Sequence, residues 1–192
     1  TVSTKPVNPL NPQEDSDPGD VVESMNPGTL AIIAYPKTMS FGNQKVGHGV
    51  QTFEADLLKP NVQLKDFRGA VSNGWNLSVG LSDFVNPEVT GAGRAVPGFL
   101  TFDNTEFFIG SSSYELEPST INSQIVVGSG EQALIASAKD GEGRGIWGFH
   151  WYAPNYETAS TNSNVTLGMN TNLVVPGNYS ANLEWTLSAT PN

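Results

Sequence analysis

Strict alternation of apolar and polar residues over residues 178–190 is the feature that most constrains how this chain can fold. Apolar side chains occupy every second position from Tyr179 to Ala189, and polar side chains occupy the positions between them. A period of two without exception is typical of a β-strand with one buried face. Residues 75–82 alternate in the same way. Both stretches contain a Trp-x-Leu triplet, formed by Trp75 and Leu77 in one and by Trp185 and Leu187 in the other.

Glycine and proline interrupt the rest of the chain too often for long helices. Short strand-like stretches at regular spacing instead predict an all-β fold, and specifically an antiparallel β-sandwich. The glycine-rich residues 139–145 are interpreted as a hairpin loop between two strands. The further expected strands cover residues 29–35, 50–57, 62–67, 99–109, 121–127, 132–138, 146–152 and 165–175.

The N-terminal residues 1–27 are rich in proline and acidic side chains, and we interpret them as an extended tail before a β-domain of residues 28–192. Such a segment has too little apolar area to offset its own ordering entropy. We therefore expect a solvated spacer that becomes ordered only against a neighbouring molecule. Thr1–Thr4 lacks proline, and it is the part able to pair with an exposed sheet edge.

Composition excludes several classes of function. The formal net charge is −10, from 19 acidic and 9 basic residues, and the bases are scattered singly. Nucleic acids and anionic membrane surfaces are therefore not expected partners. No apolar run is long enough for a membrane span. The chain has no cysteine, so it offers no disulfide or thiol chemistry.

The sequence shows no catalytic or metal-binding pattern. His48 lies between two glycines, where we expect a turn, and His150 lies on the strand parity that faces solvent or a second layer of structure. Neither histidine has a partner at metal-ligand spacing, and no nucleophile motif is present. We expect no enzymatic activity, no metal and no cofactor.

The four tryptophans all lie on the apolar parity of alternating stretches. That position favours the core for Trp75 and Trp185. Trp147 and Trp151 form a stripe with Phe149, which fits either the core or an aromatic surface that binds a ligand such as a sugar.

Several segments occur in the order seen in one known family. The apolar residues 30–42 end in Phe41-Gly42, residues 62–69 carry Asp66-x-Arg68-Gly before the first triplet, residues 141–147 read G-x-G-x-G-x-W, and residues 179–191 carry the second triplet. Together with the Pro-Asn-Pro-Leu-Asn-Pro tail, the chain over about residues 6–192 resembles the WxL-domain proteins of the Gram-positive cell surface.

The resemblance implies a secreted, wall-associated protein that binds peptidoglycan or another wall polymer non-covalently and without catalysis. It also implies other surface proteins as partners, and assembly with further copies of the chain stays open. The motif residues Trp75, Leu77, Trp185, Leu187, Asp66 and Arg68 become the candidate binding residues. The strand pattern places the Trp and Leu residues in the core, and for Asp66 and Arg68 we favour a structural role, either an ion pair or a turn, over a binding site.

Two other functions stay open. The chain is alternatively a structural subunit of a surface assembly or filament that is joined through its N-terminal segment. A third interpretation is a secreted carbohydrate-active enzyme, which would require two carboxylates facing each other across a cleft.

Overall fold

The computed structural model describes residues 5–110 and 116–190 and is all-β. Its helical residues form two single turns, η1 (Gly69–Val71) and η2 (Thr171–Leu173). The strands of the described residues are β1 (Val22–Glu23), β2 (Leu30–Tyr35), β3 (Val50–Ala55), β4 (Asn61–Asp66), β5 (Trp75–Leu81), β6 (Phe84–Val85), β7 (Ala95–Val96), β8 (Gly98–Phe102), β9 (Glu106–Ile109), β10 (Thr120–Ile121), β11 (Ile125–Gly128), β12 (Gln132–Ala138), β13 (Gly145–His150), β14 (Asn162–Asn170) and β15 (Leu183–Ala189).

Antiparallel pairing joins these strands into sheets, as the sequence predicts. The β4 sheet has the order β1-β2-β4-β13-β9, the β5 sheet has the order β10-β12-β5-β15, and the β8 sheet has the order β11-β8-β14-β3. β6 and β7 form a separate short pair. Every named strand pair within the described residues is antiparallel.

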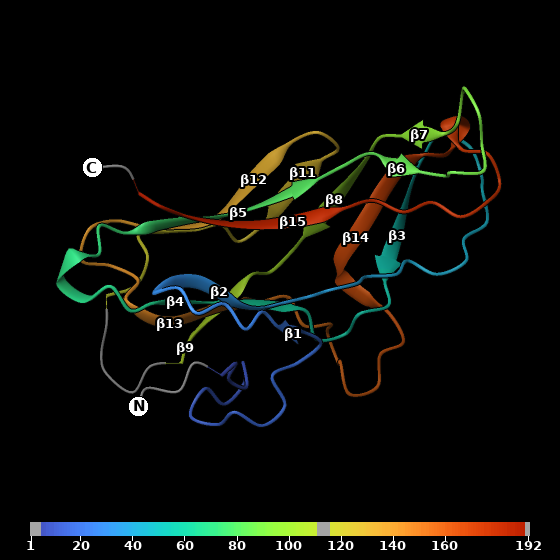
Figure 1. Cartoon of the computed structure of the whole chain (residues 1–192). Coiled ribbons are helices and arrows are strands. Elements are labelled where there is room, and N and C mark those ends of the chain that lie inside the picture. The colour runs from blue at the N-terminus through green and yellow to red at the C-terminus, as the bar shows by residue number, and fades with distance from the viewer. Residues whose placement is uncertain (1–4, 111–115, 191–192) are drawn as a thin grey trace.

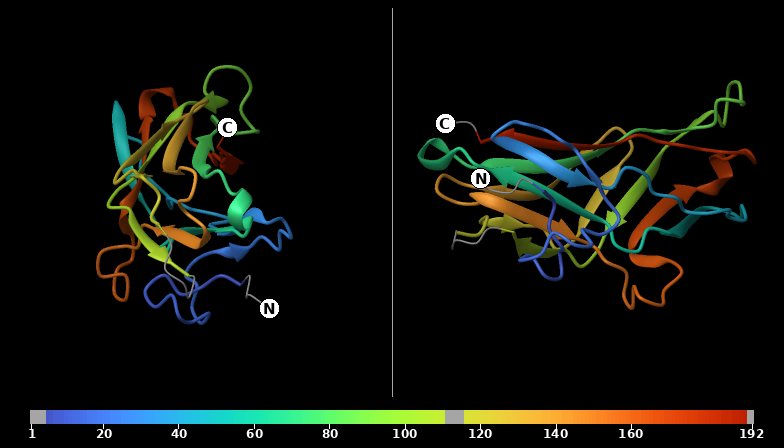
Figure 2. Two further views of the ribbon diagram at one scale, coloured as in Figure 1. Left: turned by 90° about the vertical axis from the view of Figure 1, so that its left-hand side faces the viewer. Right: turned by 60° about the horizontal axis from the view of Figure 1, so that its bottom comes forward.

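One hydrophobic core joins the three larger sheets. The β5 sheet lies opposite the β4 sheet (Figures 1 and 2). β14 and β3 of the β8 sheet lie toward the right-hand end of the molecule in Figure 1. Trp75 of β5 meets Phe149 of β13 edge to face, with 6.4 Å between ring centroids. Phe102 of β8 meets Trp185 of β15 at 5.9 Å. Aromatic contacts between sheets therefore hold the layers together.

The N-terminal segment, residues 5–27, packs against its own domain (Figure 1). The backbone N–H of Val7 donates to Gln63 Oε1 at 2.9 Å, and Gln63 Nε2 donates back to the Val7 carbonyl at 2.9 Å. Lys59 forms an ion pair with Asp17 at 2.8 Å. All six residues of β4 are buried, because the core covers one face of this strand and the N-terminal segment covers the other.

The expected extended tail is therefore not confirmed for residues 5–27. The expectation considered only the composition of the segment, whereas the β4 sheet supplies it with partners far along the chain, Gln63 and Lys59. Thr1–Thr4 lies outside the described residues. The division between residues 1–27 and residues 28–192 stays a prediction.

The alternating stretches form the strands that the sequence predicts, but the last strand of the chain is shorter than expected. Residues 75–82 contain β5, and residues 178–190 contain β15, which begins only at Leu183. The expected strand at 99–109 is divided into β8 and β9. Asn104 adopts a positive φ of 57° in the turn between them, which is the backbone conformation that asparagine tolerates better than most residues.

The glycine-rich loop at 139–145 is not a hairpin loop, so that prediction is wrong. It connects β12 of the β5 sheet to β13 of the β4 sheet and therefore crosses between layers. Gly143 has a φ of 65°, and a Cβ there would lie 2.6 Å from Trp75 Nε1. Glycine lets the backbone pass directly over the buried indole ring.

Candidate functional site around the two W-x-L strands

The two W-x-L triplets lie side by side. β15 pairs with β5 in antiparallel register, so that Leu187 is opposite Leu77 and Trp185 is opposite Val79. The strand pattern predicted both strands but not their pairing. The two halves of the motif thus form a single structural unit, although Trp75 and Trp185 are 110 residues apart along the chain.

The two triplets differ in exposure. Trp75 and Leu77 are fully buried, and Trp75 Nε1 donates to the Gly143 carbonyl at 2.8 Å. Trp185 and Leu187 are only partly buried, since β15 is the edge strand of the β5 sheet. Trp185 stacks on Trp151 at 6.1 Å. Its indole N–H is shielded from solvent and has no hydrogen-bond acceptor among the described residues.

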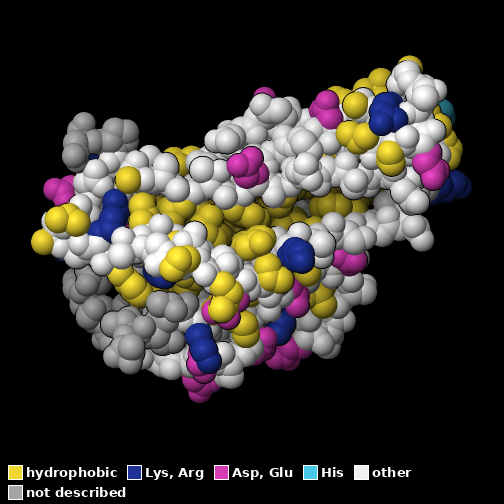
Figure 3. All heavy atoms as spheres, in the orientation of Figure 1, with side chains coloured by type: hydrophobic (Ala, Val, Ile, Leu, Met, Phe, Trp, Pro, Cys, Tyr) yellow, Lys and Arg dark blue, Asp and Glu magenta, His cyan; other side chains and the backbone are white. Residues whose placement is uncertain are grey.

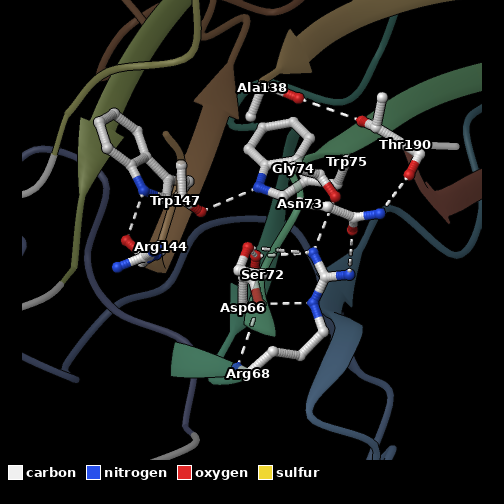
Figure 4. A network of polar contacts seen from close by, with 11 residues as sticks. Asp66, Arg68, Ser72, Asn73, Gly74, Trp75, Ala138, Arg144, Trp147 and Thr190 are labelled. Carbon is white, nitrogen blue, oxygen red and sulfur yellow. Dashed lines mark hydrogen bonds and ion pairs between the residues drawn. The ribbon is translucent and has the colours of Figure 1, made fainter. Parts of the chain in front are cut away.

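Asp66 and Arg68 form a clasp at the end of β4 (Figure 4). Arg68 Nη2 lies 2.8 Å from Asp66 Oδ2, and Arg68 Nε donates to Asp66 Oδ1 at 2.9 Å. The Ser72 hydroxyl donates to the same carboxylate. Arg68 Nη2 also donates to the Gly74 carbonyl at 2.8 Å, directly before β5 begins. The clasp therefore ties the β4 sheet to the start of the first W-x-L strand.

Asn73 extends this clasp to the second W-x-L strand. Its side chain accepts from Arg68 Nη1 at 3.1 Å and donates to the Thr190 carbonyl, just beyond the end of β15. Thr190 in turn donates from its N–H to the Gly74 carbonyl at 3.2 Å and from its hydroxyl to the Ala138 carbonyl at 3.2 Å. Figure 4 shows these side chains converging from separate strands. These hydrogen bonds connect the end of β4 with the start of β5 and the end of β15, so the arrangement is structural.

The charges of the clasp stabilise each other. Burial of Asp66 opposes its ionisation, but hydrogen bonds from the Arg68 side chain, the Ser72 hydroxyl and the Arg68 N–H outweigh that cost. The pKa of the Asp66 carboxyl is consequently lowered from its usual 3.8. The hydrogen bond to Asp66 raises the pKa of the Arg68 guanidinium. Both groups are ionised at neutral pH.

Trp147 and Trp151 do not form an aromatic surface. Their exposed fractions are 0% and 1%. Trp147 Nε1 donates to the Arg144 carbonyl at 2.8 Å, and Trp151 Nε1 donates to Thr105 Oγ1 at 2.9 Å. Their shared parity with Phe149 turns all three rings toward the core. Of the two alternatives for this stripe, core or ligand-binding surface, the structure therefore shows the core.

A groove that the sequence did not reveal opens beside β15 (Figure 3). We define the β15 groove as the space between β15 on one side and β2 with residues 36–46 on the other. Its first part, about 500 Å³, is lined by Leu30, Ile32 and Tyr35 across from Trp185 and Leu187. Its second part, about 1100 Å³, lies beside residues 36–46. Leu183 and Glu184 line both parts, so the two are continuous.

The histidines and acids do not gather into a chemical site. Within residues 5–110 and 116–190, no three His, Asp or Glu side chains lie together as metal ligands would. His150 lies against Tyr152 at 4.6 Å and Phe108 at 6.0 Å, and burial lowers its pKa to about 4. It faces a second layer of structure, one of the two positions expected for it. No helix of the described residues is long and apolar enough to cross a membrane.

Comparison of the sequence with known families finds one match. The family model of the WxL domain, described as surface cell wall-binding, matches residues 1–191. No curated protein and no solved structure was found to match the chain.

Proposed function

This chain belongs to the family of WxL surface cell wall-binding domains, and on that premise we propose that it attaches non-covalently to peptidoglycan from outside the cell, without catalysis. The observation that carries the proposal is the family match over residues 1–191 of the 192. A match of that extent supports wall binding by the domain that these residues form.

The signature residues serve as scaffold in this proposal. Trp75 and Leu77 are inaccessible, and the partners of Asp66 and Arg68 are groups of the chain itself. We propose that the three larger sheets form a β-sandwich whose stability depends on these residues. Wall polymer then contacts a surface elsewhere on that scaffold.

The outer face of the β8 sheet is our candidate for that surface. Phe99 is 36% exposed, and its ring lies over Gly168 of the neighbouring strand, where a Cβ would come within 2.0 Å of the ring. Thr101 and Thr166 are paired in the adjacent row of the same face. An exposed ring beside hydroxyl groups suits a sugar, which presents C–H faces and hydroxyls together.

Sedimentation with purified peptidoglycan, stripped of proteins and secondary polymers, tests the proposal. Wild-type protein should co-sediment, and Phe99→Ala should reduce the bound fraction several-fold with little change in melting temperature. Phe107→Ala on β9 of the β4 sheet is the matched control, since Phe107 is also exposed, at 40%. Absence of wild-type co-sedimentation would refute the function, and full binding by Phe99→Ala would refute only the choice of face.

The same preparations test the absence of catalysis. Incubation with peptidoglycan should release no reducing sugar and no free amine, because the sequence carries no nucleophile motif. Product release that a single Glu→Gln substitution abolishes would establish an enzyme instead.

The alternative function, a surface assembly joined through the N-terminal segment, gains no support from the fold. Residues 5–27 already use Val7 and Asp17 to bind their own domain. They are therefore engaged within the chain.

A further inference from the structure

β15 has a free edge that faces the β15 groove. Its even-numbered residues point their backbone groups toward β5, as the bonds from Ser82 N–H to the Asn182 carbonyl and from Thr190 N–H to the Gly74 carbonyl establish at the two ends. In an antiparallel pair the intervening residues point the other way. The N–H and C=O groups of Leu183, Trp185 and Leu187 therefore face away from β5. Among the described residues β5 is the one strand hydrogen-bonded to β15, and β2 lies beside β15 without pairing with it.

This edge lacks the usual protection against strand addition. Natural edges are shortened, bulged or supplied with proline and lysine. β15 is seven residues long, pairs with β5 without a register shift, and contains Glu184 as its single charged residue. Partly buried apolar side chains of Leu30 and Ile32 lie across the groove from it. The unpaired backbone groups of β15 thus lie beside the apolar side chains of Leu30 and Ile32, which form the floor of the groove.

The charge of the groove differs from that of the molecule. Lys37 and Lys45 line its second part, and Glu184 is the single acidic lining residue in either part. The whole chain, in contrast, has a net charge of −10. Asp56 reaches the same loop but accepts from the Ser40 N–H instead of lining the groove. The lysine end of the groove therefore complements an acidic group.

We propose that an extended β-strand of a second, different protein adds to the free edge of β15 and fills the β15 groove. The strand is apolar on the face toward Leu30 and Ile32, and acidic at the end beside Lys37 and Lys45. Its backbone would pair with Leu183, Trp185 and Leu187 as a fifth strand of the β5 sheet. An antiparallel strand places its C-terminal end beside the lysines.

Other occupants fit these features less well. A glycan lacks backbone groups at the strand repeat, and its hydroxyls would lose water against an apolar floor without compensation. A second copy of this chain that pairs β15 with β15 would bring Leu187, Ser188 and Ala189 to the lysine end of the groove, and none of these residues is acidic. Two copies would also each bring a charge of −10 to the contact.

Selection of a displayed random peptide library on the full chain tests the proposal. Peptides of about ten residues span a strand of typical length. Selected sequences should alternate apolar and polar residues and carry Asp or Glu toward their C-terminal end. Synthetic versions with N-methyl groups on alternate backbone amides, chosen to remove the pairing donors, should bind at least about tenfold more weakly. Failure of the library to yield such peptides would overturn the proposal.

Hydrogen exchange locates the binding. In the free protein the amides of Leu183, Trp185 and Leu187 should exchange faster than those of Glu184 and Thr186, which face β5. A selected peptide should protect the three odd-numbered amides. Protection already present in the free protein that grows with its concentration would identify a second copy as the occupant, and unchanged exchange with bound peptide would place binding elsewhere; either result would overturn the proposal.

Charge reversal provides matched variants. The double variant Lys37→Glu, Lys45→Glu should weaken peptide binding several-fold, and the effect should fade at high salt. Lys139→Glu, on the loop at 139–145, should leave the affinity unchanged. Leu30→Glu should block the groove. If Leu30→Glu abolished co-sedimentation with peptidoglycan, the groove would be the wall site and this inference would fail while the wall-binding function stood.

Discussion

At the scale of single residues, the two signature tryptophans differ in whether the indole N–H has a partner. Trp75 donates to the Gly143 carbonyl, and Trp185 has no acceptor among the described residues. Trp75→Phe should therefore lower the free energy of unfolding by about 1–3 kcal/mol, the range for leaving a buried polar group unsatisfied. Trp185→Phe should change it much less.

Denaturant unfolding of both variants measures this difference. Trp75→Ala should cost about 3–5 kcal/mol, as for other buried aromatic truncations. Equal losses for the two phenylalanine variants would show that the hydrogen bond to Gly143 contributes nothing and that ring volume alone matters.

The Asp66–Arg68 pair predicts a dependence of stability on pH. Arg68→Ala leaves a buried carboxylate without its partner and should cost about 3–5 kcal/mol at neutral pH. The folded-state pKa of Asp66 is below its usual 3.8. The stability that ionised Asp66 contributes is thus complete above pH 3.8 and is lost as the pH falls through the folded-state pKa.

Unfolding free energies measured from pH 7 down to pH 2 check this sign. The difference between wild type and Arg68→Ala should shrink as the pH falls toward the folded-state pKa of Asp66 in the wild type, because the protonated Asp66 no longer needs the guanidinium. A difference that stays the same down to pH 2 would contradict the assignment of the clasp as an ion pair.

At the scale of elements, local patterns predicted more than long-range contacts did. β5 and β15 follow from alternation, which is a property of consecutive residues. Nothing local shows that Val7 meets Gln63, 56 residues away. The loop at 139–145 has the glycine content of a hairpin, yet its course is fixed by Trp75. The free edge of β15 is likewise a property of sheet order, which alternation does not contain.

The packing of the N-terminal segment predicts that it stabilises the domain. Val7 is 8% exposed, whereas Leu10 in the same segment is 52% exposed. Val7→Ala should cost about 1–2 kcal/mol through lost apolar burial, and Leu10→Ala should be nearly neutral. Deletion of residues 1–20 should cost more, since it also removes the partner of the buried Gln63 side chain.

Thermal unfolding of dilute protein measures these effects. A deletion variant that melts at the wild-type temperature would restore the interpretation of this segment as a tail. Loss of stability in the deletion without a difference between the two alanine variants would locate the contribution outside the Val7 contact.

At the scale of the whole molecule, the candidate site and the fold use the same residues. Asp66 and Arg68 were expected to form either an ion pair or a turn, and they form an ion pair, while Leu77 and Leu187 meet across one strand pair. Trp147 and Trp151 were left open between core and surface, because alternation identifies the face of a strand but not what covers it. The groove has no sequence signature, because it depends on the distance between two sheets.

The shared core predicts that the described domain unfolds as one cooperative unit. The four tryptophans line this core from β5, β13 and β15 and from the residue after β13, and Phe102 of the β8 sheet packs against two of them. Tryptophan fluorescence should therefore report the same denaturant midpoint as far-UV circular dichroism, which reports all the sheets.

Hydrogen exchange tests whether residues 5–27 belong to the same unit. If they do, the opening free energy for exchange of the Val7 amide, which is bonded to Gln63, should be close to the free energy of global unfolding. Separate midpoints would divide the sheets into independent domains. A single midpoint with a fast-exchanging Val7 amide would instead leave the β-domain cooperative and show that the N-terminal cover opens by itself.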